Sequence, residues 1–322
     1  MIAVDLDGTL IGPEGAISPR NLQAIHAAER AGIEVVFATG RRHGYAMKLL
    51  RGLGIRSAAT LVSSNGAVTR TIAADLIARS HLSRSTALWL CGCFGEFRNS
   101  LVITFDTVTS SGEDTRGALV VEDLADLHAS IGRWMLANEP YLQQVVPIEC
   151  ALDAGDPIQM MLCGSVDRMR RAEARLTRDP RVLAVGASTR PGVEVVLNRT
   201  EYPERDLSIL DILPAGCSKG VALLSLAASW DLSPAGIMAI GDNWNDLSML
   251  EIAGRPVLMG NAPPELKELA ADRGWRLTAR NDEDGVALAI EHLLEHLPLP
   301  GLASPEPEPV TSFEPEPVTF LS

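Results

Sequence analysis

The start of the chain alternates short apolar runs with an amphipathic segment. The runs are rich in β-branched side chains, as is typical of buried strands in a parallel sheet, and cover residues 2–4, 33–38 and 60–63. Between the first two runs, Ser18 suits a helix cap, Pro19 a first helical turn and Gly32 a helix end. Strand, helix and strand within about forty residues predict a right-handed βαβ unit. A second helix is expected over residues 42–53.

The same alternation returns in the last third of the chain. Apolar runs expected as strands cover residues 207–213, 236–240 and 256–259. Amphipathic segments expected as helices cover residues 218–228, 264–272 and 283–296. We therefore expect two distant segments, residues 1–78 and 199–298, to build one doubly wound α/β core with a parallel sheet.

The middle of the chain has a different pattern. Helical stretches near residues 83–97 and 166–177 alternate with strand-like runs at 101–105, 158–162 and 182–185. None of these runs ends in a carboxylate pair or a Gly-Asp step, so we expect a separate α/β cap, residues 79–198, inserted into the core. Residues 198–206 are polar and are interpreted as the connector back to the core.

The C-terminal stretch, residues 299–322, has low complexity. The motif Pro305-Glu-Pro-Glu-Pro-Val-Thr returns as Glu314-Pro-Glu-Pro-Val-Thr. Such a composition favours extended, polyproline-like chain and cannot bury enough apolar surface to fold. We predict a disordered tail, in which Phe313 and Phe320 are candidates for a contact with another protein.

The net charge of the chain and the lengths of its apolar runs argue against several classes of binding partner. The 322 residues carry a formal net charge of -13, which argues against nucleic acid and anionic membranes as partners. No apolar run is long enough to span a membrane, and we expect no signal peptide before the first strand. The five cysteines lack a C-x-x-C spacing and are expected to be buried, reduced thiols, which predicts a cytoplasmic protein. A phosphorylated small molecule stays open as substrate, because a local site can carry its own cations.

Two carboxylates follow the first strand directly. Asp5 and Asp7 are spaced i, i+2, where a parallel sheet places its ligands. Two like charges so close repel each other, and Mg²⁺, which prefers oxygen ligands, would relieve that repulsion. The alternative is an ordinary junction of strand and loop, with both carboxylates solvated.

Other chemically useful side chains also follow predicted strands. They are Thr39 with Gly40, Lys219 in Ser218-Lys219-Gly220, and Asp242 in Gly241-Asp242-Asn243-x-Asn245-Asp246. With Asp5-x-Asp7-Gly8-Thr9-Leu10 they resemble, in order and type, the four motifs of haloacid dehalogenase (HAD) superfamily phosphatases. Ser64-Asn65-Gly66-Ala67, Met259-Gly260-Asn261-Ala262 and Asn281-Asp282-Glu283-Asp284-Gly285-Val286 resemble the Cof-type, class IIB members. The motifs that resemble the family lie in residues 1–75 and 207–295. The segment between them resembles the family's cap only in its position and its size.

The resemblance and the chemistry of phosphate monoesters suggest the same roles. Asp5 is the candidate nucleophile and Asp7 the candidate general acid and base. Mg²⁺ is expected between Asp5, the backbone carbonyl of Asp7 and Asp242. The candidate phosphate-binding residues are Thr39, through its hydroxyl and its backbone N–H, with Gly40, Lys219 and Asn245. Asp246 is expected to orient Lys219 and the metal site from behind.

We therefore predict a Mg²⁺-dependent phosphatase acting on small phosphorylated metabolites, such as sugar phosphates. Two alternatives stay open. A phosphomutase of the same superfamily would pass the phosphoryl group on rather than lose it to water. A non-catalytic regulatory protein would use the tail for binding, although it would not need the Asp5 and Asp7 pair.

Overall fold

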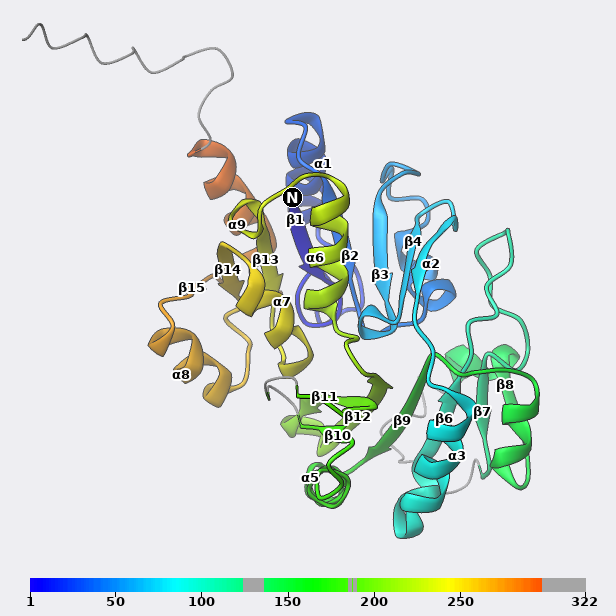
Figure 1. The fold of residues 1–322 in the computed structure, drawn as a ribbon. Coiled ribbons are helices and arrows are strands. Elements are labelled where there is room, and N and C mark those ends of the chain that lie inside the picture. Colours follow the sequence, from blue (N-terminus) through cyan, green and yellow to red (C-terminus); the bar gives the residue numbers. More distant parts are fainter. Residues whose placement is uncertain (124–135, 185–186, 188–189, 297–322) are drawn as a thin grey trace, which may run out of the picture.

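The computed structural model describes residues 1–123, 136–184, 187 and 190–296, and its strands form two sheets (Figure 1). Within these residues the first sheet has the strand order β15-β14-β13-β1-β2-β3-β4-β5. The second sheet has the order β10-β11-β12-β9-β6-β7-β8. The predicted doubly wound α/β core and the additional α/β sheet are both present.

The first sheet is parallel from β15 to β3 and ends in an antiparallel hairpin. Its parallel strands are β1 (Ile2–Asp5), β2 (Val35–Ala38), β3 (Thr60–Ser63), β13 (Met238–Gly241), β14 (Arg255–Leu258) and β15 (Arg276–Leu277). The hairpin strands are β4 (Val68–Thr71) and β5 (Leu76–Arg79), and the sequence pattern did not predict them. β1 lies between β13 and β2, so segments from both ends of the chain meet at the middle of the sheet.

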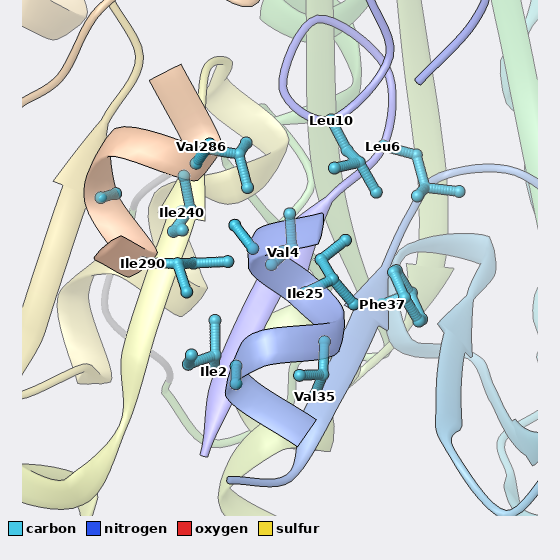
Figure 2. Packing of buried hydrophobic residues seen from close by; sticks show 14 of the residues in the cluster. Ile2, Val4, Leu6, Leu10, Ile25, Val35, Phe37, Ile240, Val286 and Ile290 are labelled. Atoms are coloured by element: carbon cyan, nitrogen blue, oxygen red, sulfur yellow. The ribbon is translucent and has the colours of Figure 1, made fainter. Parts of the chain in front are cut away.

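Helices cover both faces of the first sheet. One face packs against α1 (Pro19–Arg30), α2 (His43–Leu50) and α9 (Gly285–Glu295). The other packs against α6 (Lys219–Ser229), α7 (Leu247–Ile252) and α8 (Pro264–Asp272). Because successive side chains of a strand point to opposite faces, Ile2 and Val4 belong to the first cluster and Ala3 to the second. Figure 2 shows Ile2 and Val4 packed against Ile25 and Ile290.

The second sheet is covered by helices on one face. Its strands are β6 (Leu101–Thr104), β7 (Leu119–Val121), β8 (Leu142–Gln144), β9 (Gln159–Gly164), β10 (Val182–Leu183), β11 (Val195–Tyr202) and β12 (Leu207–Pro214). Among the residues that the structure describes, its helices are α3 (Arg84–Cys93) and α5 (Val166–Leu176). Leu162, Leu210 and Ile212 pack toward these helices. Their neighbours along the strands, such as Met161, Ile209 and Asp211, line a cavity on the opposite face.

Seven short 3₁₀ helices complete the described elements. They are Ser64–Gly66, Gly95–Ser100, Glu139–Tyr141, Ile148–Asp153, Pro203–Arg205, Pro234–Gly236 and Trp244–Asp246. The first and the last of them lie beside the carboxyl ends of first-sheet strands β3 and β13.

The structure corrects the expected return to the core. The polar stretch 198–206 is not a connector, because β11 runs to Tyr202 and pairs along its whole length with β12. The expected core strand 207–213 is β12 of the second sheet, between β11 and β9. A tight turn over Pro203–Arg205, closed by Asp206 in a left-handed conformation, joins the two strands. The chain thus returns to the first sheet only after Pro214, and the assignment of 199–214 to the core is wrong.

Three further sequence expectations have different outcomes. None of the helices in the described residues is both long and apolar enough to cross a bilayer. Cys91, Cys163 and Cys217 are buried thiols, as expected, but Cys93 is half-buried and Cys150 is exposed. The tail, residues 299–322, lies outside the described residues.

Candidate active site

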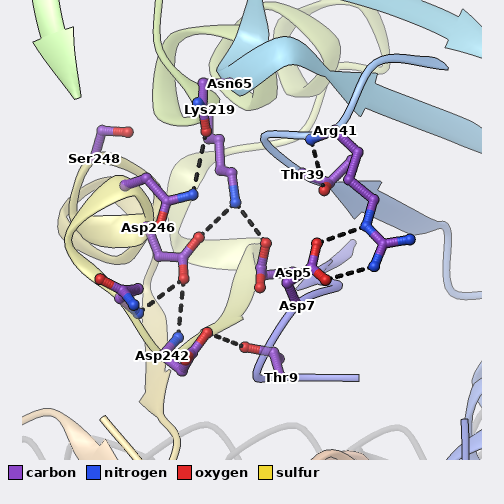
Figure 3. A network of polar contacts seen from close by, with 12 residues as sticks. Asp5, Asp7, Thr9, Thr39, Arg41, Asn65, Lys219, Asp242, Asp246 and Ser248 are labelled. Carbon is purple, nitrogen blue, oxygen red and sulfur yellow. Dashed lines mark hydrogen bonds and ion pairs between the residues drawn. The ribbon is translucent and has the colours of Figure 1, made fainter. Parts of the chain in front are cut away.

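All the residues assigned to the site from the sequence lie at one edge of the first sheet. Asp5 ends β1, Thr39 follows β2, and Asp242 follows β13. Lys219 begins α6, with Ser218 as its cap. Because the carboxyl ends of parallel strands share an edge, Asp5, Thr39 and Asp242 meet there. Lys219 joins them from the start of α6, which packs on the first sheet, although more than 200 positions separate it from Asp5. Figure 3 shows their side chains directed toward one another.

Lys219 lies between two carboxylates. Its Nζ is 2.6 Å from Oδ1 of Asp5 and 2.6 Å from Oδ1 of Asp246, and the side chain is fully buried. Burial alone would lower the pKa of Lys219, but the charges of Asp246 and Asp5 outweigh it and raise the pKa. Lys219 is therefore a permanent buried cation.

Asp5 and Asp242 carry negative charge that Lys219 does not fully compensate. Burial, followed by the charge of Asp246, raises the pKa of Asp5 to about 7, although Lys219 opposes the shift. Burial, followed by the charge of Asp5, raises the pKa of Asp242 well above its ordinary value. The hydroxyl of Thr9 donates to Oδ1 of Asp242 at 3.0 Å. A further cation at this place would therefore be stabilising.

The donor set fits a divalent cation held by oxygen. Carboxylate oxygens of Asp5, Asp242 and Asp246 lie within 4.8 Å of one another, and all three residues are buried. Asp246 is already engaged, because its Oδ1 accepts from Lys219 and its Oδ2 accepts the backbone N–H groups of Asp242 and Asn243. Asp5 and Asp242 are thus the carboxylates left to hold a metal, and Asp246 holds Lys219 and the backbone in place.

The close approach of two strand ends depends on Gly8. Its backbone has a φ of +82°, and a Cβ at this position would collide with the carboxylate of Asp242. Asn261, from the segment after β14, donates to the carbonyl of Gly8 at 2.8 Å. The motif after β1 is therefore packed directly against the motif after β13.

The carboxylate of Asp7 is not turned toward this cluster. It faces Arg41, whose Nε donates to Oδ2 at 2.7 Å and whose Nη2 donates to Oδ1 at 2.6 Å. The expected metal ligand from Asp7 is its backbone carbonyl, and the contacts of its side chain with Arg41 are compatible with that expectation. No role was expected for Arg41 from the sequence, although its position directly after Thr39 and Gly40 places it at the same strand edge.

Thr39 differs in part from its expected role. Its backbone N–H donates to the carbonyl of Val62 on β3 at 2.8 Å, so the prediction that this N–H binds phosphate is wrong. Its hydroxyl oxygen accepts the backbone N–H of Arg41 at 3.1 Å and retains a proton to donate. Gly40 lines the cavity beside Asp5 and Asp7.

Asn245 also lines the cavity, but its amide is bound to a residue that the sequence analysis left without a role. Nδ2 of Asn245 donates to Oδ1 of Asn65 at 3.2 Å. Nδ2 of Asn65 in turn donates to Oδ2 of Asp211, from the second sheet, at 2.7 Å. A polar residue within the apolar strand 207–213 was the available signal for Asp211.

The site opens into a cavity of about 340 Å³ between the two sheets. Its first-sheet side is polar and includes Asp5, Asp7, Arg41, Tyr45, Asn243 and Asn245. Its second-sheet side combines apolar groups, Leu119, Met161, Cys163, Leu207 and Ile209, with the polar groups Thr104, Gln159, Thr200 and Asp211. This volume fits a small molecule with an apolar part and several hydrogen-bonding groups.

The chain is similar to proteins of known family. A model of the haloacid dehalogenase-like hydrolase family matches residues 2–290. The chain is 31% identical over 312 residues to a 5-amino-6-(5-phospho-D-ribitylamino)uracil phosphatase of Bacillus subtilis, with 91% of this chain and 97% of the relative covered.

Two solved structures share the fold. A haloacid dehalogenase-like hydrolase from Bacteroides thetaiotaomicron has a TM-score of 0.67 at 24% identity, covering 91% of this chain and 98% of that one. A HAD subclass IIB sugar phosphatase has a TM-score of 0.65 at 19% identity, also covering 91% of this chain and 98% of that one.

Proposed function

Because the chain belongs to the haloacid dehalogenase-like hydrolase family and is a hydrolase of phosphoric monoesters, we propose that it is a Mg²⁺-dependent phosphatase of small phosphorylated metabolites. Asp5 forms an aspartyl-phosphate intermediate. One observation carries the proposal: Asp5 lies at the floor of the cavity with a fully buried lysine on one of its carboxylate oxygens. The other oxygen is the one that attacks phosphorus.

The positive charge and the hydrogen-bond donor near Asp5 can bind the oxygens of a phosphoryl group. Lys219 supplies a permanent positive charge beside the nucleophile, and the Thr39 hydroxyl is available as a donor. Catalysis of phosphoryl transfer consists mostly of positioning and neutralising the phosphoryl oxygens. In this proposal Lys219, Thr39, Gly40 and Asn245 bind the group while Asp5 attacks it.

Asp7 is the general acid and base of the proposal. It lines the cavity two residues after the nucleophile, and Arg41 holds both of its oxygens. For the first step Asp7 must release one of its hydrogen bonds to Arg41 and take up a proton from solvent, which it then gives to the leaving ester oxygen. In the second step it takes a proton from the water that attacks the aspartyl-phosphate.

Asp5 and Asp242, with the backbone carbonyl of Asp7, are the residues proposed to hold Mg²⁺. The bound ion would neutralise charge between the Asp5 carboxylate and the incoming phosphate. The raised pKa values of Asp5 and Asp242 support the assignment, since both carboxyls lie close together in a buried place.

The second-sheet side of the cavity sets the substrate class. Its polar groups can bind hydroxyls of a sugar or polyol, and its apolar groups can cover the rest of the leaving group. A sugar phosphate and a phosphorylated ribityl compound both have this character, and relatives act on such substrates by name. We therefore propose a phosphorylated sugar or sugar alcohol, with or without an attached ring.

Hydrolysis of p-nitrophenyl phosphate with and without Mg²⁺, followed by a panel of phosphorylated sugars and polyols, tests the proposal. We expect Mg²⁺-dependent release of inorganic phosphate and a phosphorylated Asp5 that can be trapped. Product analysis on hexose phosphates separates the alternatives. A transferred phosphoryl group would indicate a phosphomutase, and no turnover on any ester would indicate a binding protein.

A further inference from the structure

A chain of hydrogen bonds runs from Asp211 on the second sheet to Asn245 at the phosphate site. We propose that Asp211 is a positioning residue: it orients the Asn65 amide, which orients Asn245, so that phosphate binding requires the second sheet to be in place. The inference rests on the proposed function, in which Asn245 is a phosphate ligand. It gives a role to Asp211 and to Asn65, the second residue of the Ser64-Asn65-Gly66-Ala67 motif.

The direction of this chain follows from chemistry. Both oxygens of Asp211 accept an amide N–H, one from Nδ2 of Asn65 and one from Nε2 of Gln159. Since a carboxylate only accepts, Asn65 must present its NH₂ group to Asp211 and its carbonyl to Asn245. Asn245 must then present its own NH₂ group to Asn65. One carboxylate thus fixes how two amides are turned.

The backbone of Asn65 leaves its side chain little other freedom. Asn65 is fully buried and has a left-handed conformation, with φ of 53° and ψ of 32°. Its backbone N–H donates to the carbonyl of Thr39 at 3.0 Å, and that of Ser64 donates to the carbonyl of Arg41 at 2.8 Å. Asn is one of the few non-glycine residues that adopt this conformation readily. These two backbone hydrogen bonds hold Asn65 against the phosphate-binding segment. Asp211 then determines which end of the Asn65 amide, the NH₂ group or the carbonyl, faces Asn245.

Burial of the Asp211 carboxylate is energetically unfavourable, which argues against a purely structural role. Asp211 is 4% exposed, and within the described parts of the chain it forms no ion pair. Burying a carboxylate without a cation is unfavourable. Leu207 and Ile209 lie on the same face of β12 and are apolar. Because these neighbours are apolar, the carboxylate at position 211, bound to the amides of Asn65 and Gln159, indicates a role at the site.

Another buried carboxylate provides a matched control. Asp106, in the segment after β6, binds Arg70 on β4 at 2.7 Å and Arg79 on β5 at 2.9 Å. It links the second-sheet segment to the first sheet, as Asp211 does, but it has no hydrogen bond to Asn65. Its loss should weaken the contact between the sheets without turning the amides of the phosphate site.

The experiment measures binding of inorganic phosphate by calorimetry in the presence of Mg²⁺, together with thermal stability, above about pH 7.5, where Asp211 is a carboxylate. The variant Asp211→Leu removes the acceptor, and Asn65→Gly removes the amide at a backbone conformation that glycine tolerates. We expect each to raise the dissociation constant of phosphate by about 10-fold or more, as loss of a supporting hydrogen bond does. The double variant should bind no more weakly than the single ones, because both act through the same amide. Asp106→Asn should lower thermal stability and leave the affinity for phosphate unchanged.

A conservative variant adds a second readout. Asp211→Asn keeps one acceptor for Asn65 if Gln159 turns its own amide, so it should restore most of the affinity that Asp211→Leu loses. Unchanged phosphate affinity in Asp211→Leu, or additive losses in the double variant, would overturn the inference. A wild-type protein that binds phosphate but turns over no ester would contradict the proposed function alone. A wild-type protein that does not bind phosphate would overturn both.

Discussion

Arg41 holds Asp7 by two parallel hydrogen bonds, from Nε to Oδ2 at 2.7 Å and from Nη2 to Oδ1 at 2.6 Å. This planar, bidentate arrangement fixes the orientation of the carboxylate as well as its position. The Arg41 guanidinium also lies 4.8 Å from the ring centre of Tyr45, which lines the same cavity. The carboxylate of the proposed general acid and base thus has a defined direction before any substrate enters.

The variant Arg41→Lys tests this relationship. Lysine keeps the positive charge but cannot bind both oxygens of Asp7 at once. We expect kcat on an alkyl phosphate to fall by about 10-fold or more, within the range of positioning effects. The rate on p-nitrophenyl phosphate should fall less, because its leaving group needs little help from an acid. Equal losses on the two esters would assign Arg41 to phosphate binding instead.

The variant Asp7→Asn removes the acid itself. A sugar alkoxide is a poor leaving group and needs the proton, whereas p-nitrophenolate leaves readily without it. We therefore expect a loss of about 100-fold or more on an alkyl phosphate and a distinctly smaller loss on p-nitrophenyl phosphate. Since Asp7 also activates water, phosphoenzyme should accumulate with either ester.

The burst phase separates the two roles of Asp7, because it reports the first chemical step before water attacks. The burst rates on the two esters should fall by different factors. If they fall by the same factor, Asp7 does not protonate the leaving group and only maintains the local structure.

The sequence was sufficient for residues that follow parallel strands. The positions of Asp5, Thr39 and Asp242 could be predicted because each comes directly after an apolar run, and the ends of such strands meet at one edge. Lys219 begins the helix after a motif that was recognised as a unit. In these cases, local pattern and general topology determine the place of a side chain.

The sequence was not sufficient where a contact joins the two sheets. Asn65 and Asp211 are 146 positions apart, and their contact depends on how the second sheet lies on the first. The same reason explains the error at 198–206. Asn198 and Thr200 are polar although they belong to an inner strand, and Thr200 lines a polar cavity. Polarity that serves a cavity cannot be told from the polarity of a loop by periodicity alone.

The variant Asp5→Asn tests the nucleophile. The amide has nearly the size of the carboxylate but cannot attack phosphorus as an anion, and it still accepts a hydrogen bond from Lys219. We expect nearly complete loss of turnover and of phosphoenzyme, with an unchanged circular dichroism spectrum. Turnover close to that of the wild type in a folded variant would exclude Asp5 from this role.

Asp242→Asn tests the metal site by a measurement that does not depend on turnover. Mg²⁺ should raise the melting temperature of the wild type, because a ligand that binds the folded state stabilises it. In the variant, the Mg²⁺ concentration needed for half of this shift should rise by about 10-fold or more. In EDTA the variant should be at least as stable as the wild type, because it lacks the repulsion between Asp242 and Asp5. An identical Mg²⁺ response in both proteins would place the metal elsewhere.

The burial of Asp211 predicts that its contribution to the free energy of unfolding depends on pH. Burial raises its pKa to about 7, while the hydrogen bonds from Gln159 and Asn65 and the charge of Lys219 oppose the shift. The ordinary pKa of an aspartate is about 3.9, so between pH 4 and 7 the folded state binds more proton at Asp211 than the unfolded state. The contribution of Asp211 to the free energy of unfolding is therefore fully present below pH 4 and is lost as the pH rises to 7.

Asp211→Leu lacks this titrating group. The difference between its free energy of unfolding and that of the wild type should therefore shift in favour of the variant as the pH rises from 4 to 7. Above pH 7.5 the difference between the two proteins should level off, since Asp211 is then ionised in both states. Chemical denaturation at several pH values in metal-free buffer measures the difference directly. Asp106→Asn, which removes a carboxylate already paired with Arg70 and Arg79, should not reproduce this rise. A pH-independent difference between Asp211→Leu and the wild type would mean that Asp211 has the same pKa in the folded and unfolded states.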